Sequence, residues 1–556
     1  MLVVVGFLGL CETLSMNTSL GAIAPRQSGS ASRWALTGVI LAVSMTTIDQ
    51  TIVALSVPTI EQHLGVTHDA MQWVVNIYLL ATAAFFLVGG RLADVFGYRR
   101  MVIIGIAGFG LTSLLCGCAP TGDLATAWLI AARALQGVSG AIMFPAAIGI
   151  VVEAFPRETR GRSMATFFTI TGAMTAVGPI AGGYLNEWTW RAIFWVNVPI
   201  AILALVLVPL TTRASTRRAE KIDWLGAAVI ALGMIGVVFG LQQASSWGWT
   251  NPVVLVSLGL GAILIVTFVV LQSRSAIPLL RIDAFRDRGF LLSTLCTLFA
   301  SAAFVSTFFF LSVYGQVSLA MSPMDTGLLF LKLFAGFVIG SRIGSSWFDR
   351  HGARLVIIGG GLVGAFGFAW LTHTLTNLNI DPVALFNAQT LPIVVAGLGF
   401  GLMLTPVSTD AVNRAVGARY SEVSAVTQTM KNFGAALGMA VFSTMVTSAL
   451  TTSLTASFVK FGGTAHDAQS AINQLQGASS AHDGGPLAHL PQVIQDQVTH
   501  AVQNDYALAA QWAFGGMVVA MLIVAVLGVF YPKQRKSHNA EQASLLVSDT
   551  TGPALN

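Results

Sequence analysis

GGRLADVFGYRR, residues 89–100, is a short charged turn with glycines between two long apolar segments. A second version, GSSWFDRHGAR, occupies residues 344–354. In both versions an aspartate precedes a glycine by three positions, and the sequence VIIG follows at 102–105 and at 356–359. A repeat of this kind predicts a chain built from two comparable halves.

The composition indicates which solvent surrounds the chain. Of its 556 residues, 54% are hydrophobic and only 10% are charged, whereas soluble proteins carry about 25% charged residues. So few polar groups could not cover a water-soluble globule, so we expect the surface to face lipid. The four cysteines lie in apolar segments without CxxC spacing, so neither a metal site nor a cofactor is expected.

Long apolar runs predict an all-α membrane protein. A helix needs about 20 apolar residues to cross a bilayer, and such segments must be helical because lipid cannot pair free backbone groups. We predict fourteen spans, near residues 35–58, 72–90, 101–119, 124–150, 162–184, 192–210, 223–243, 252–272, 290–314, 326–347, 354–374, 386–407, 423–448 and 508–531.

The positions of lysine and arginine predict the orientation. Most of the 29 Lys and Arg residues fall in alternate connections, and such connections face the cytoplasm. Both termini are therefore expected in the cytoplasm, with the chain in the cytoplasmic (inner) membrane. The net positive charge of the chain is then explained by its cytoplasmic loops, and no nucleic-acid partner is expected.

The repeated turn also predicts how the chain is divided. Each turn joins the second and third helices of a six-helix set, so we expect two six-helix bundles with an inserted helix pair between them. The outward stretch 449–506 is expected to be a loop with short helices near 465–476 and 491–502. The predicted parts are a cytoplasmic extension (1–33), the first bundle (34–210), a linker with the inserted pair (211–275), the second bundle (276–531) and a cytoplasmic tail (532–556).

Asp49 is the candidate for ion chemistry. Of the 24 acidic residues it is the one placed well inside a predicted span. A carboxylate near the bilayer centre is costly and usually marks an ion path. Asp49 is therefore the candidate proton carrier, and a capped or paired structural acid is the alternative.

Several motifs resemble those of one known family. GGRLADVFGYRR and LIAARALQGVSGA (129–141) resemble signatures of the major facilitator superfamily. GAMTAVGPIAGGYL (172–185) resembles the antiporter signature of its drug exporters. IDQTIVALSVP (48–58) and WRAIFWVNVPI (190–200) resemble the fourteen-span drug:proton antiporter branch.

The resemblance implies three sets of working residues. The first is a cytoplasmic latch that holds the outward-facing state: Gly90, Arg91, Asp94, Gly97, Arg99 and Arg100. The second is a motif that prevents proton leak between the halves: Gly178, Pro179, Gly182 and Gly183. The third is Arg133, for which the resemblance implies a role in proton coupling. The alternatives are a capped positive loop, simple helix packing and a structural ion pair, respectively.

The spacing of Arg133, Gln136, Gly137 and Gly140 places them on one helix face. Lys332 and Lys431 also fall inside predicted spans, where a charge normally faces a cavity. We therefore expect Lys332, Lys431 and Gln136 to line the central cavity, with tolerance for neutral or anionic substrates. Lysines that snorkel or pair with carbonyls are the alternative.

The sequence thus predicts a proton-coupled exporter of hydrophobic drugs, antibiotics or toxic metabolites that works by alternating access. The alternatives are a proton-coupled uptake symporter of an organic anion and a transporter-like membrane sensor or scaffold. No Walker A pattern, nucleophile–base set or paired metal ligands occur in the spans, so an enzyme is not expected. The expected partners are small hydrophobic substrates, protons and the lipid bilayer. We expect a monomer, and a periplasmic adaptor is an open alternative.

Overall fold

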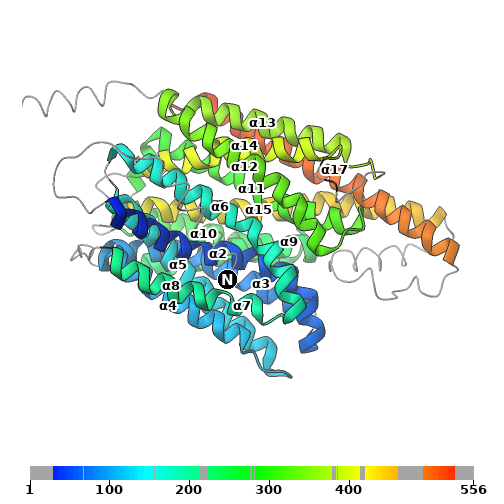
Figure 1. The fold of residues 1–556 in the computed structure, drawn as a ribbon, viewed down its shortest axis with the longest axis horizontal. Coiled ribbons are helices and arrows are strands. Elements are labelled where there is room, and N and C mark those ends of the chain that lie inside the picture. The colour runs from blue at the N-terminus through cyan, green and yellow to red at the C-terminus, as the bar shows by residue number, and fades with distance from the viewer. Residues whose placement is uncertain are drawn as a thin grey trace, which may run out of the picture.

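The computed structural model describes residues 29–532 except 67, 156, 213–221, 276–277, 281, 379–383, 385, 414–419 and 461–491. This part of the chain is helical, without strands (Figure 1). The helices are α2 (Gly29–Leu64), α3 (His68–Phe96), α4 (Tyr98–Gly117), α5 (Leu124–Ala154), α6 (Arg157–Trp188), α7 (Ala192–Trp195), α8 (Asn197–Thr211), α9 (Trp224–Trp247), α10 (Pro252–Arg274), the 3-10 helix η1 (Ile282–Arg286), α11 (Arg288–Val317), α12 (Pro323–His351), α13 (Ala353–Thr374), α14 (Thr390–Asn413), α15 (Tyr420–Lys460) and α17 (Gln492–Phe530).

The predicted spans correspond to helices of suitable length. In the described part of the chain, 13 helices are long and apolar enough to cross a bilayer. The remaining predicted span, 162–184, lies in α6, which has 32 residues but is richer in threonine, glycine and charge. The all-α membrane fold is therefore confirmed.

The two turns have the same backbone role. Gly97 separates α3 from α4 with φ 95°, and Gly352 separates α12 from α13 with φ 77°. Residues other than glycine rarely adopt such backbone angles, and the shared spacing of the two turns places a glycine at each sharp junction. Helix pairs correspond in the same way: α3 packs along α5 in the first half, and α12 packs along α14 in the second.

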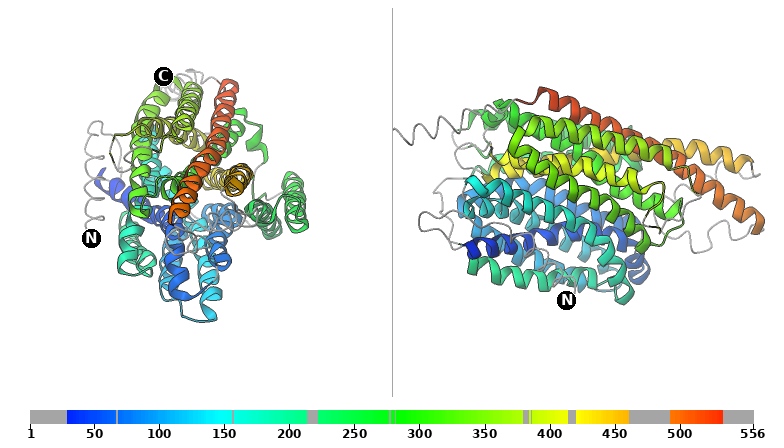
Figure 2. Two further views of the ribbon diagram at one scale, coloured as in Figure 1. Left: turned by 90° about the vertical axis from the view of Figure 1, so that its right-hand side faces the viewer. Right: turned by 45° about the horizontal axis from the view of Figure 1, so that its top comes forward.

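The inserted pair forms a hairpin that packs on α3 and α15 through α9. Asp223 caps α9 by accepting from the Gly226 backbone N–H at 2.9 Å, and its second oxygen accepts from Gln272 Nε2 of α10 at 2.7 Å. In Figure 2 this pair stands at the side of the two bundles. Valines, leucines and isoleucines of α10 remain exposed, as expected for a helix with lipid as its solvent.

The connection between α15 and α17 is shorter than predicted. Helix α15 continues to Lys460 and α17 begins at Gln492, so both helices enter the stretch 449–506 that we expected to be a loop. The short helix predicted near 491–502 is the first part of α17. The one predicted near 465–476 lies outside the described residues.

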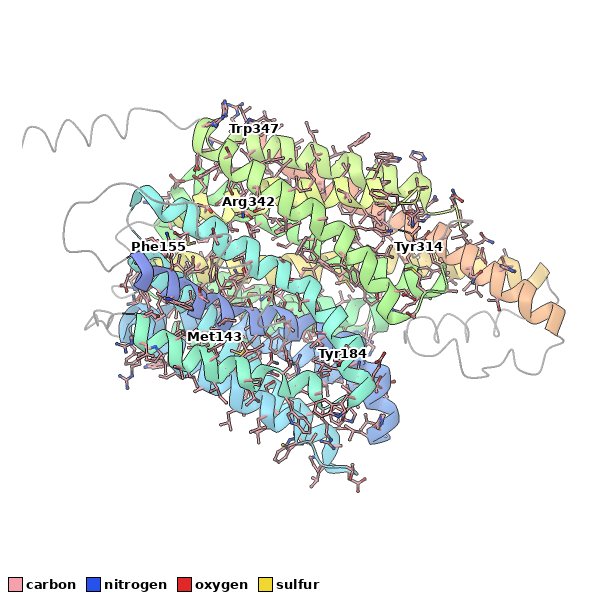
Figure 3. The ribbon with its side chains drawn as sticks, viewed as in Figure 1. Met143, Phe155, Tyr184, Tyr314, Arg342 and Trp347 are labelled. Atoms are coloured by element: carbon pink, nitrogen blue, oxygen red, sulfur yellow. The ribbon has the colours of Figure 1, made fainter. Side chains whose placement is uncertain are left out.

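The halves meet toward the end of the molecule that carries the repeated turns. Figure 3 shows Phe155 and Trp347 toward this end, and Tyr184 and Tyr314 toward the opposite one. Here Thr169 Oγ1 of α6 lies 2.5 Å from Ser341 Oγ of α12, and Ser341 Oγ lies 3.0 Å from Thr405 Oγ1 of α14.

One helical turn along, a Cβ added to Gly172 of α6 would lie 3.1 Å from the ring of Phe337 of α12. Residues of α3 and α15 also share a buried apolar cluster, with Leu87 and Val88 on one helix and Val423 and Val426 on the other. Close apolar and hydroxyl contacts therefore join the halves from the middle of α6 and α12 toward this end.

Candidate functional site

Asp49 and Arg133 form an ion pair inside the first bundle. Arg133 Nη1 of α5 contacts Asp49 Oδ2 of α2, and the two side chains are 1% and 0% exposed. A buried charge must be paired to persist at this depth. The two residues that the sequence proposed for proton coupling are thus brought together directly.

Neutral groups complete the surroundings of this pair. Gln136 Oε1 accepts from Arg133 Nη1 at 2.8 Å, while Gln136 Nε2 donates to Asp49 Oδ1 at 3.0 Å. The guanidinium carbon of Arg133 lies 4.3 Å from the centroid of the Tyr78 ring, where the ring face attracts a cation. Arg133 Nε donates to the Val74 carbonyl at 3.3 Å.

Glycines on the same face of α5 let the helices come this close. A Cβ on Gly137 would collide with the Tyr78 carbonyl and the side chains of α3, and one on Gly140 would lie 3.3 Å from Thr46 of α2. Small residues permit such close approach between membrane helices. On this face of α5 the two glycines therefore allow close packing, while Arg133 and Gln136 hold the charged pair in place.

Gln136 differs from its predicted position. We expected it to line the central cavity, but it is fully buried and engaged with both charged residues. The amide matches the shape of the ion pair, since its oxygen faces the cation and its nitrogen faces the carboxylate. It belongs to the Asp49 site.

Three further side chains of this site were not predicted. Asn197, the first residue of α8, donates from Nδ2 to Asp49 Oδ1 at 3.5 Å and to Ser113 Oγ at 3.1 Å. Cys116 Sγ lies 3.9 Å from Gln136 Oε1. Asn197 was visible in the sequence as a lone amide in the apolar run 192–210, but its partners required the fold. We name Asp49, Tyr78, Ser113, Arg133, Gln136 and Asn197 the buried polar cluster.

The glycines of the antiporter motif pack α6 against α2. A Cβ on Gly178 would meet the Thr51 hydroxyl and the Ile48 carbonyl, and one on Gly182 would meet Ile52. These contacts flank Asp49 on its own helix. Pro179 lies within α6, and Gly183 is half-buried there. Close packing is therefore what the geometry supports directly, and the leak-preventing role remains a prediction.

The residues of the predicted latch lie at the α3–α4 junction. Arg91 and Asp94 are buried, and Asp94 Oδ1 accepts from the Tyr98 hydroxyl at 2.9 Å. Arg99 Nη2 donates to the Pro209 carbonyl at 2.7 Å, which ties α4 to the end of α8 within the same half. Gly90 is buried and Arg100 is exposed. The latch function remains a prediction.

The two lysines have different environments. Lys332 Nζ donates to the Ala384 carbonyl at 2.9 Å, which matches the alternative of a lysine paired with a carbonyl. Lys431 of α15 is half-buried and makes no hydrogen bond or ion pair with the described residues. The cavity role of both lysines remains a prediction.

Comparison with known proteins agrees with this architecture. Residues 39–439 match the sequence profile of the Major Facilitator Superfamily. This chain belongs to the Major Facilitator Superfamily. Members are membrane transporters, so the chain is a multi-span transporter of this superfamily.

Relatives in the superfamily include named resistance and export proteins. The puromycin resistance protein pur8 of Streptomyces alboniger is 36% identical over 75% of this chain and 82% of its own length. The cephamycin export protein CmcT of Amycolatopsis lactamdurans is 33% identical over 74% of this chain and 85% of its own length.

Solved structures share the superfamily fold at low identity. The human organic anion transporter MFSD10 superposes with a TM-score of 0.57 at 12% identity, covering 89% of this chain and 99% of that one. The proton:xylose symporter XylE gives a TM-score of 0.56 at 12% identity, covering 91% and 96%. At such identity the similarity describes the fold alone.

Proposed function

We propose that this transporter exports hydrophobic drugs, antibiotics or toxic metabolites, and that inward movement of protons drives the export. The observation that carries the proposal is the buried Asp49–Arg133 pair at the centre of a membrane-spanning bundle. The names of the puromycin and cephamycin relatives support the substrate class.

The pair offers a physical route from proton binding to movement. Protonation of Asp49 neutralises the carboxylate and leaves the Arg133 guanidinium with only the neutral Gln136, Tyr78 and backbone groups around it. An uncompensated buried charge costs about 3–5 kcal/mol. A rearrangement that gives Arg133 a wetter environment would relieve that cost, and loss of the proton would restore the pair.

The available energy suits this scheme. A proton gradient supplies about 1.4 kcal/mol per pH unit, and a membrane potential supplies about 2.3 kcal/mol per 100 mV for each charge. One or two protons therefore support a substrate gradient of roughly tenfold to hundredfold.

The proposal includes the setting of the protein. It places the chain as a monomer in the cytoplasmic membrane with both termini in the cytoplasm, where the basic loops face inward. A periplasmic adaptor for the outward ends of α15 and α17 remains an open partner.

Replacement of the proton carrier tests the proposal. Asp49→Asn keeps the shape of the side chain but cannot exchange a proton, so proton-driven efflux of puromycin from proteoliposomes should be lost. Asp505→Asn is a matched control, because Asp505 is also buried but bonds the neutral Ser457 at the outer ends of α15 and α17. Full efflux by folded Asp49→Asn would refute the proton-carrier role.

Uptake of an organic anion is the second candidate, because Lys431 has no partner among the described residues. The direction of transport separates the two functions. Under an imposed pH gradient, antiport moves the substrate against the proton flow, whereas symport moves it along with the protons.

A further inference from the structure

Asn197 has a polar side-chain atom without a hydrogen bond beside the proposed proton carrier. Its side chain is fully buried, and Nδ2 serves both Asp49 Oδ1 at 3.5 Å and Ser113 Oγ at 3.1 Å. Its Oδ1 is buried without a hydrogen-bond donor in the described part of the chain. A buried unpaired polar atom usually costs about 1–3 kcal/mol, so its presence here calls for a physical reason.

The other amide of the buried polar cluster behaves differently. Gln136 uses its oxygen for Arg133 and its nitrogen for Asp49. Rotation of that amide by half a turn would bring its nitrogen to the cation and its oxygen to the carboxylate. Gln136 is therefore fixed in one orientation, whereas Asn197 has no cation on its oxygen side to hold it.

The two protonation states of Asp49 need different partners. The carboxylate only accepts hydrogen bonds, while the protonated acid carries one O–H that must find an acceptor. Asn197 meets the first need with Nδ2 in the orientation seen here. Rotation about its terminal torsion would meet the second need, because Oδ1 would then face the Asp49 O–H.

Ser113 makes the rotation feasible. Its hydroxyl accepts from Asn197 Nδ2 and donates to the Phe194 carbonyl at 2.9 Å. A hydroxyl can reverse its role and donate to Oδ1 once the amide has turned. In the turned orientation the Ser113 proton leaves the Phe194 carbonyl and Nδ2 replaces Oδ1 as the unpaired amide atom. That orientation therefore becomes favourable only when the Asp49 O–H donates to Oδ1.

We propose that Asn197 is a positioning residue for Asp49 that pairs with both of its protonation states, donating through Nδ2 to the carboxylate and accepting through Oδ1 from the acid. This inference rests on the proposed function, in which Asp49 carries the proton. It assigns to α8, at the periphery of the first bundle, a direct part in proton binding.

Infrared spectroscopy tests the proposal without a transport substrate. In purified protein, the carbonyl band of the protonated carboxyl that is lost in Asp49→Asn reports Asp49, and its intensity is followed against pH. Asn197→Leu removes both hydrogen bonds at similar size. The bond to the charged carboxylate is the stronger of the two, so its loss favours the acid. We expect the titration midpoint to rise by at least about half a pH unit, a roughly threefold change in proton affinity, and the carbonyl frequency to rise.

Asn186→Leu is the matched control. Asn186 of α6 donates from Nδ2 to Ser56 Oγ of α2 at 2.8 Å and also has a buried oxygen without a donor, but it does not touch Asp49. Its substitution should leave both the midpoint and the frequency unchanged. Asn197→Ser, which keeps a donor and an acceptor, should return the midpoint toward that of the original protein and also serves if the leucine variant does not fold.

The failures are distinguishable. A folded Asn197→Leu variant with an unchanged band and midpoint overturns the role of Asn197 alone. If no titrating carboxyl band depends on Asp49, the proton-carrier function itself fails, and the role of Asn197 fails with it.

Discussion

The two halves share a packing plan but fill it with different chemistry. In the first half, Gly178 and Gly182 of α6 pack on α2; in the second, Gly434 and Gly438 of α15 pack on the Leu298 and Ala302 carbonyls of α11. In each half the fifth spanning helix, α6 or α15, thus approaches the first one, α2 or α11, through two glycines one turn apart. The repeat constrains where backbones touch and leaves the interior free to diverge.

The interiors differ in charge. The first half encloses the Asp49–Arg133 pair. The corresponding region of the second half is aromatic: Phe304 lies 5.1 Å from Phe400 and 5.8 Å from Phe337, and Phe308 lies 5.6 Å from Phe334, measured between ring centroids. The difference teaches that one repeated fold can hold a charged pair, the proposed proton site, in its first copy and an apolar contact surface in its second.

The largest expected effect comes from uncoupling the ion pair. Arg133→Leu should lower the free energy of unfolding by about 3–5 kcal/mol, because the Asp49 charge is left buried without its partner. The double variant Asp49→Asn with Arg133→Leu should recover most of this loss yet remain inactive in proton-driven efflux. Thermal unfolding in detergent measures the first effect, and a double variant no more stable than the single one would contradict it.

The loss of stability on replacing a helix-packing glycine should be comparable in the two halves. Gly178→Val and Gly434→Val each force a side chain into the backbone of a neighbouring helix, which should cost about 1–3 kcal/mol. Only Gly178→Val displaces the segment of α2 around Asp49, so it alone should change the pH dependence of efflux. Equal pH profiles for both variants would show that the halves are not functionally separate.

The glycines of the repeated turns should give a smaller, symmetric effect. Gly97→Ala and Gly352→Ala place a side chain at φ 95° and 77° with extended ψ of 139° and 178°, a backbone region nearly confined to glycine, which costs about 1–2 kcal/mol. Each variant should unfold at a lower temperature by a similar amount. A much larger loss of transport for Gly97→Ala than for Gly352→Ala, at equal stability, would indicate that the first turn has the predicted latch role.

The smallest effect is expected at Lys431. Lys431→Met removes a half-buried cation that has no partner in the described part of the second half, so stability should change by less than about 1 kcal/mol. The ratio of anionic to neutral substrate transported should fall by a fewfold. Competition between a carboxylate drug and its methyl ester measures this ratio, and an unchanged ratio would exclude a substrate role for Lys431.

Sequence patterns predicted the membrane fold, the repeat and the charged centre because each depends on residue type and spacing alone. Apolar length defines a span, glycine defines a junction, and an acid within a span demands a partner. Asp49 and Arg133 could therefore be nominated separately, although their sequence separation of 84 residues hid the contact.

The remaining parts of the site depend on three-dimensional neighbours. Asn197 is one amide in an apolar run, and its approach to Asp49 follows from the way α8 packs on α2 and α4. The bond from Lys332 to the Ala384 carbonyl likewise depends on a neighbour that is 52 residues away in the sequence. The length of the loop between α15 and α17 was overestimated because a helix can continue through polar sequence beyond its apolar span.

The hydroxyl contact between the halves has a consequence for how the transporter responds to its surroundings. Thr169, Ser341 and Thr405 carry no charge, so the hydrogen bond that joins α6 to α12 is not weakened by ionic screening. Separating α6 from α12 exchanges the Thr169–Ser341 bond for bonds to water at a net cost of about 0.5–1.5 kcal/mol, while the Ser341–Thr405 bond stays within the second half. This contact should therefore open as readily in concentrated salt as in dilute buffer, and water activity should govern its opening.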